Sequence, residues 1–120
     1  MKLRFRENRL RLRVNRREVE ALSNGTSLLE QVDFPGDARL AYILESASTN
    51  SPAAEFKSGV IRVAVPASEI QAWASTDTIG IYFELPANGK PLKVAIEKDL
   101  ECSDAPAEER DPDAYPRKNC

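Results

Sequence analysis

The chain has 120 residues, with 17 Lys and Arg against 19 Asp and Glu, and its formal net charge is −2. The absence of histidine excludes Ser-His-Asp catalysis and His-ligated zinc. No apolar stretch approaches the roughly 20 residues of a membrane helix, and the N-terminal segment lacks the apolar core of a secretory signal. We therefore expect a cytoplasmic protein whose two cysteines, Cys102 and Cys120, are reduced.

Two segments of the chain match each other in residue type. Residues 10–22 correspond to residues 61–73 at an offset of 51, as the pair Val14 and Val65 shows. Glu18 then falls on Glu69, and a leucine falls on Trp73. The match predicts a duplicated supersecondary unit.

The first half begins with two short strands and a helix. Residues 2–6 and 9–14 alternate apolar and charged side chains, which predicts half-buried strands joined by a two-residue turn at Glu7-Asn8. Asn15, followed three residues later by Glu18, is typical of a capped helix start. Asn24-Gly25 is expected to end this helix, with Val19 and Leu22 on its buried face.

Two more strands complete each half. Residues 27–34 and 78–85 are matched strands, and each is followed by a turn and a further strand. Residues 28, 32 and 34 are expected to face the core. In the second half Ser58-Gly59 is the hairpin turn, Pro66 the first helical residue, and Ile70 and Trp73 the buried stripe.

The predicted fold is an α+β domain over residues 1–100, made of two duplicated ββαββ units at about 2–47 and 53–98. The units are expected to form a mainly antiparallel curved sheet or barrel with two short helices. Residues 101–120 form an acidic, proline-containing tail, either disordered or laid over the domain with Tyr115 as an anchor.

The charge of the first hairpin is the most informative feature. A two-residue turn places Lys2 opposite Arg13, Arg4 opposite Arg11, and Arg6 opposite Arg9, and directly opposed like charges destabilise a sheet. In the second hairpin Glu55 should oppose Arg62, which is a compensated pair. The candidate anion-binding residues, which include two at the start of the first helix, are Lys2, Arg4, Arg6, Arg9, Arg11, Arg13, Arg16 and Arg17.

Carboxylates elsewhere in the domain, or the acidic tail, could neutralise this patch. Alternatively, the patch binds an anion, either a phosphate-containing small molecule or an acidic protein surface. The negative net charge argues against nucleic acid as the partner. Neither explanation requires a cofactor.

A third interpretation is enzymatic. If the strands closed into a barrel around the arginines, the layout would resemble the triphosphate-tunnel (CYTH-like) hydrolases, which have a duplicated arrangement around an eight-stranded barrel. That resemblance implies a Mg²⁺-dependent phosphohydrolase, with the metal held by Glu30, Glu45, Glu84 and Glu97. The alternating glutamate-lysine signature of the family is absent, because LRFRENRLRLR carries arginines at those positions.

The C-terminal part supports another resemblance. EKDLEC at residues 97–102 and DAYP at residues 113–116 resemble a small bacterial family of short proteins that bear a domain of unknown function. The resemblance covers nearly the whole chain and implies no activity or cofactor. We therefore expect a non-enzymatic binding or interaction module, with the tunnel-type phosphohydrolase and a structural homodimer as alternatives.

Overall fold

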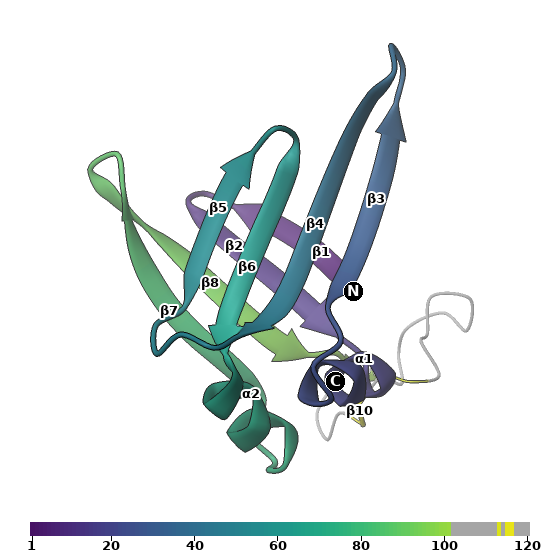
Figure 1. Cartoon of the computed structure of the whole chain (residues 1–120), viewed down its shortest axis with the longest axis vertical. Helices are drawn as coiled ribbons and strands as arrows, with labels where there is room; N and C mark the ends of the chain where they lie inside the picture. The colour runs from purple at the N-terminus through teal and green to yellow at the C-terminus, as the bar shows by residue number, and fades with distance from the viewer. Residues whose placement is uncertain (102–112, 114, 117–120) are drawn as a thin grey trace. The chain divides into compact units, whose positions relative to one another are not determined.

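The computed structural model describes residues 1–101, 113, 115 and 116 (Figure 1). Cys102, Cys120 and most of the predicted acidic tail lie outside the described residues. The chain divides into two compact units. Unit 1 contains Met1–Glu20 and Thr78–Cys120, and unit 2 contains Ala21–Asp77.

Each unit contains one four-stranded sheet. In unit 1 the strands lie in the order β1 (Lys2–Arg6), β2 (Arg9–Val14), β8 (Lys90–Lys98) and β7 (Gly80–Ala87). In unit 2 the order is β3 (Leu28–Phe34), β4 (Ala38–Ala47), β6 (Val60–Pro66) and β5 (Ala53–Lys57). The helices are α1 (Arg16–Ser23) and α2 (Ala67–Ala74), and the short strands β9 (Leu100–Glu101) and β10 (Tyr115–Pro116) pair in parallel.

The α+β class is confirmed, but the prediction of one curved sheet or a barrel is wrong. Both sheets are mixed, because β2 pairs with β8 in parallel, β4 pairs with β6 in parallel, and the other neighbours are antiparallel. The chain leaves one sheet after β2 and enters the other at β3, with α1 between them. Each sheet thus combines hairpins from both predicted halves, and the described strands leave it open at two edges.

The two N-terminal hairpins of the predicted halves have the expected register. Arg4 lies opposite Arg11 in β1–β2, and Glu55 lies opposite Arg62 in β5–β6. The turns require positive φ, which Glu7 adopts at 55° and Gly59 at 76°. A Cβ at Gly59 would also lie 2.9 Å from a main-chain carbonyl oxygen of β4, so the second turn favours glycine for space as well.

The cores follow the predicted alternation along the central strands. In unit 1, Leu12 and Ile96 lie side by side on β2 and β8, and both are almost fully buried. In unit 2, Val63 and Leu44 hold the same relation on β6 and β4. Apolar residues packed in this way are the main source of stability in a small domain. The helical residues predicted to be buried are confirmed as buried: Val19, Leu22, Ile70 and Trp73.

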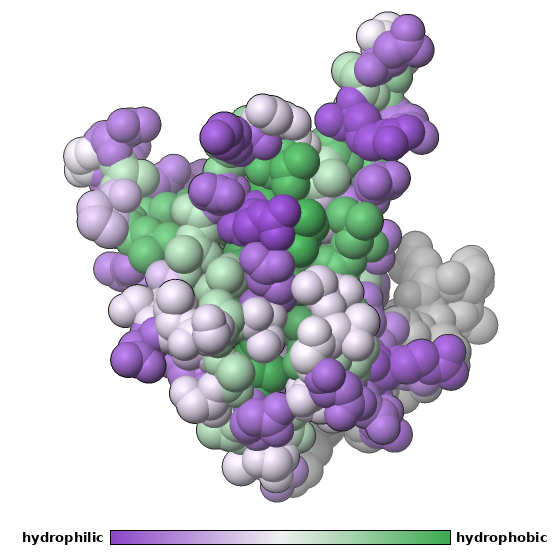
Figure 2. All heavy atoms as spheres, in the orientation of Figure 1, coloured by the Kyte–Doolittle hydropathy of each residue, from purple (hydrophilic) through white to green (hydrophobic). Residues whose placement is uncertain are grey.

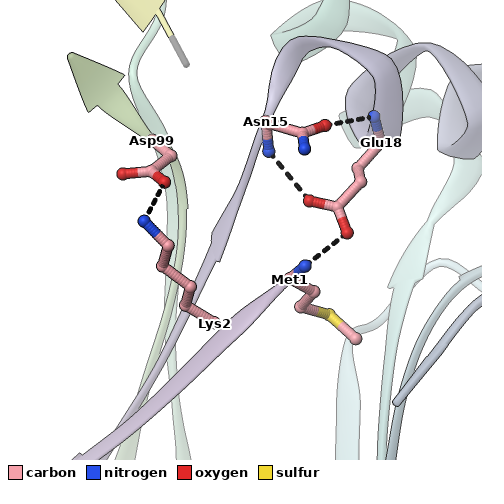
Figure 3. Close-up of polar contacts among 5 residues, drawn as sticks. All are labelled: Met1, Lys2, Asn15, Glu18 and Asp99. Atoms are coloured by element: carbon pink, nitrogen blue, oxygen red, sulfur yellow. Dashed lines mark hydrogen bonds and ion pairs between the residues drawn. The ribbon is translucent and has the colours of Figure 1, made fainter. Parts of the chain in front are cut away.

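The predicted cap of α1 is confirmed (Figure 3). The amide of Glu18 donates to Oδ1 of Asn15 at 2.9 Å, and the amide of Asn15 donates to Oε1 of Glu18 at 3.0 Å. The amino group of Met1 contacts the other carboxylate oxygen of Glu18. At the second helix the prediction is off by one residue, because Pro66 ends β6 and precedes α2.

The β3–β4 hairpin differs from the sequence prediction. Val32 and Phe34 were expected in the core, but they are 42% and 50% exposed. The reason is that β6 pairs with β4 only from Ala41 onward, so the outer part of the hairpin has no third strand beside it. Figure 2 shows hydrophilic residues at the tip of this hairpin.

Candidate functional site

The basic side chains of β1 and β2 lie on one face of the unit 1 sheet. The ladder places Lys2 opposite Arg13, Arg4 opposite Arg11, and Arg6 opposite Arg9, as predicted. Residues opposite one another in a sheet project to the same side, so these six cations form one surface, here called the basic face. The apolar residues of the same strands project to the other side, where Leu10, Leu12 and Val14 are buried.

Two cations of the basic face have carboxylate partners. Nζ of Lys2 lies 2.7 Å from Oδ2 of the buried Asp99 (Figure 3). Nε of Arg11 lies 3.0 Å from Oε1 of Glu97 on β8. The other four have no ion-pair partner among residues 1–101, 113, 115 and 116, namely Arg4, Arg6, Arg9 and Arg13.

A hollow lies at the turn end of the basic face. It has a volume of about 390 Å³, and its lining includes the side chains of Arg4, Arg6, Glu7, Arg9 and Arg11. We call it the arginine hollow. Arg4, Arg6 and Arg9 are exposed, so their guanidinium groups are open to a ligand from solvent. Guanidinium groups arranged in this way suit phosphate or carboxylate oxygens, which accept paired hydrogen bonds from them.

The two arginines at the start of α1 have a different environment. Nε of Arg17 lies 3.5 Å from Oδ2 of Asp113, and the guanidinium of Arg16 lies 5.4 Å from the ring centre of Tyr115. The amide of Arg16 also donates to the main-chain oxygen of Asp113 at 2.7 Å. Burial raises the pKa of the Tyr115 phenol. Asp113 and Tyr115 therefore contact these two arginines, whereas no ion pair joins a described C-terminal residue to Arg4, Arg6 or Arg9.

The carboxylates predicted to bind Mg²⁺ are distributed over both units. Glu84 lies 3.8 Å from Lys93, Glu97 pairs with Arg11, and Glu45 lies 3.0 Å from Arg62. Glu30 lies on β3 opposite a tyrosine of β4. Among the described residues, no group of three or more His, Cys, Asp or Glu side chains is arranged to hold a metal ion.

One ion pair occurs at corresponding places in the two sheets. Arg11 of β2 pairs with Glu97 of β8, and Arg62 of β6 pairs with Glu45 of β4, both at 3.0 Å. In each case the pair bridges the two parallel central strands. We infer that Arg11 belongs to the architecture of the sheet, and that the functional signal comes from its neighbours on the basic face.

Sequence analysis missed one residue of this face, Tyr82 on β7. Its hydroxyl donates to Oε2 of Glu97 at 2.7 Å, and this hydrogen bond is the main cause that raises the pKa of the phenol. The alternation in residues 78–85 did place Tyr82 on the side away from the core. Its position beside the arginines depends on the parallel pairing of β2 with β8, which no local pattern indicated.

The fold and the face define a small α+β protein with an exposed cluster of arginines on one sheet. The chain belongs to the family of unknown function DUF7009, whose family model matches residues 1–119. This confirms the resemblance to proteins that bear a domain of unknown function. No curated protein and no solved structure matches the chain. Among the described residues, no helix is long and apolar enough to cross a membrane.

Proposed function

We propose that the protein is a cytoplasmic, non-enzymatic binding module and that its basic face binds an anionic ligand, a phosphate-containing small molecule. The observation that carries this proposal is the arginine hollow. Three exposed arginines there, Arg4, Arg6 and Arg9, have no carboxylate partner among the described residues. Opposed like charges cost stability, so a selected benefit is needed to explain their presence.

The distribution of partners supports a ligand in the hollow. Lys2, at the end of the face away from the turn, is paired with Asp99, and Arg11, in the middle of the face, is paired with Glu97. The C-terminal residues Asp113 and Tyr115 contact the α1 arginines instead. Within the part of the chain that the structure describes, Arg4, Arg6 and Arg9 are therefore exposed and have no carboxylate partner, which supports an external anion as their ligand.

We also propose that the chain arose by duplication of a ββαββ unit. The element order strand, strand, helix, strand, strand occurs twice. Leu12 pairs with Ile96 in one sheet as Val63 pairs with Leu44 in the other. The sequence match relates Leu12 to Val63 at the offset of 51, and the following strands place Leu44 and Ile96 in correspondence at an offset of 52. The tunnel-type phosphohydrolase is not favoured, because it requires a closed barrel and the described strands form two open sheets.

A thermal-shift titration of the full chain tests the binding proposal. Tripolyphosphate, pyrophosphate and sulfate are compared at constant ionic strength, with and without Mg²⁺. We expect tripolyphosphate to raise the unfolding temperature most, because more oxygens can contact the three arginines at once. In Arg4→Ala/Arg9→Ala the shift should disappear. A shift that is equal in the wild type and this variant would contradict the proposal.

A further inference from the structure

An aromatic side chain lies in line with the arginines across the unit 1 sheet. The register places Arg4 opposite Arg11, Arg11 opposite Ala95, and Ala95 opposite Tyr82. Because paired residues project to the same side of a sheet, one row crosses all four strands. It starts with two arginines, passes over a small residue and ends at a phenol ring.

The ring of Tyr82 lies over the main chain of Gly80. A Cβ on that glycine would be 2.6 Å from the Tyr82 hydroxyl oxygen and 2.7 Å from Cζ, so only glycine leaves room for the ring there. Tyr82 is nevertheless 62% exposed. A ring that rests on the sheet and is still this exposed presents its outer surface to solvent.

The orientation of this ring is fixed by a short chain of polar contacts. The Tyr82 hydroxyl donates to one oxygen of Glu97 at 2.7 Å, and Nε of Arg11 lies 3.0 Å from the other in an ion pair. The same carboxylate therefore holds both the phenol and the guanidinium. A platform fixed before a ligand arrives loses little side-chain entropy on binding.

A second hollow lies beside this platform. It has a volume of about 320 Å³, and its lining includes Tyr82, Ala95, Lys93, Arg9 and Arg11. We call it the tyrosine hollow. Arg9 and Arg11 also line the arginine hollow, so the two hollows are neighbours that share a basic wall.

We propose that the two hollows together bind a nucleotide, with its base stacked on Tyr82 and its phosphates in the arginine hollow. This inference rests on the proposed binding of a phosphate-containing ligand and names its class. Arginine recognises phosphate oxygens through paired hydrogen bonds, and aromatic rings stack on nucleobases. The small side chain of Ala95 leaves space for a flat group between the ring and the arginines.

The unit 2 sheet provides an internal comparison. There Leu29 lies opposite Ile43, at the place where Tyr82 lies opposite Ala95. A branched aliphatic residue thus fills the position of Ala95, and the aromatic ring is absent. The sheet without the arginine cluster thus also lacks the aromatic ring and the small residue beside it, so these features occur together.

The test compares adenosine diphosphate with pyrophosphate by isothermal titration calorimetry on the full chain. We expect adenosine diphosphate to bind about tenfold more tightly, because stacking of one base adds to the shared phosphate contacts. Tyr82→Leu and Ala95→Ile introduce the unit 2 residue types at these positions. Each should reduce the ratio of the two affinities to about one, whereas Tyr82→Phe should retain most of the preference.

Binding of both compounds with equal affinity to the wild type would overturn this inference and leave the phosphate site in place. Binding of neither compound would overturn the proposed function as well. Retention of the tenfold ratio in both Tyr82→Leu and Ala95→Ile would show that the base lies elsewhere. If a short single-stranded RNA bound more than tenfold tighter than adenosine diphosphate, the assignment to a free nucleotide would be wrong.

Discussion

The hairpins β1–β2 and β5–β6 have the same pairing register and two-residue turns but differ in charge. Arg4 and Arg11 face each other in the first, whereas Glu55 and Arg62 occupy the same places in the second. The arginine opposite Arg6 in the first hairpin is a valine, Val60, in the second. The second hairpin therefore shows that this register forms without the arginine cluster. The additional charge of β1–β2 requires another explanation, which we find in ligand binding.

The largest expected effect on stability concerns Lys2, the cation of the basic face that contacts a buried carboxylate. Lys2→Met should destabilise the protein by about 1–3 kcal/mol, because the side chain of Asp99 is only 8% exposed and would lose its partner. Urea denaturation followed by tryptophan fluorescence measures the change. A loss no larger than that of Lys57→Met on β5 would show that the contact with Asp99 is unimportant.

The ion pairs Arg11–Glu97 and Arg62–Glu45 should contribute similar amounts to the free energy of unfolding. Glu97→Gln in unit 1 and Glu45→Gln in unit 2 each remove a carboxylate that bridges the central strands. Because these groups are partly exposed, we expect a destabilisation of about 0.5–1 kcal/mol in each case. The measurement is urea denaturation of both variants at one salt concentration, in a Tyr82→Phe background, because Glu97 also accepts the hydrogen bond from Tyr82. Clearly unequal losses would mean that the pairs have different roles.

A smaller effect of opposite sign is expected at Arg9. Arg9→Val introduces the residue type of Val60 and removes the repulsion with Arg6 across the ladder. In the absence of a ligand the variant should be more stable by a few tenths of a kcal/mol at low salt. The gain should shrink as salt screens the charges, which thermal unfolding in 10 mM and 500 mM NaCl would detect. A destabilised variant at both salt concentrations would contradict this.

The smallest effect concerns the pH dependence of stability that arises from the ionisation of Tyr82. The hydrogen bond to Glu97 raises the pKa of Tyr82 above its ordinary value of 10.0, so folding favours the neutral phenol. The resulting stability is complete below pH 10 and is lost as the pH rises through the folded-state pKa. NMR titration of the tyrosine ring carbons should show a lower pKa in Glu97→Gln. An unchanged pKa would mean that the hydrogen bond does not form.

Local patterns in the sequence predicted the elements and the hairpin register well. The alternation of Arg and Leu in β2, the Asn15–Glu18 cap and the helical spacing of Ile70 and Trp73 are all patterns that span only a few residues. The pairing of β2 with β8 could not be predicted in this way, because it joins strands about 80 residues apart. For the same reason the sequence suggested one sheet or a barrel.

The candidate site was therefore only half predictable. The arginines of β1 and β2 are neighbours through a single turn, so their common face follows from the hairpin register. Tyr82 joins them only through two further strand pairings, and the position of its ring depends on Gly80 beneath it. Gly80 is visible two positions before Tyr82, but the two strand pairings leave no signal in the residues around it.

The central claim is that the basic face of β1–β2 is a binding site and not a requirement of the fold. Calorimetric titration of tripolyphosphate into Arg4→Glu/Arg9→Val, whose new residues are those of the second hairpin, tests it most directly. We expect a folded protein whose affinity is at least about a hundredfold lower than that of the wild type, with Lys57→Ala unchanged. An unfolded variant, or a folded one that retains wild-type affinity, would contradict the claim.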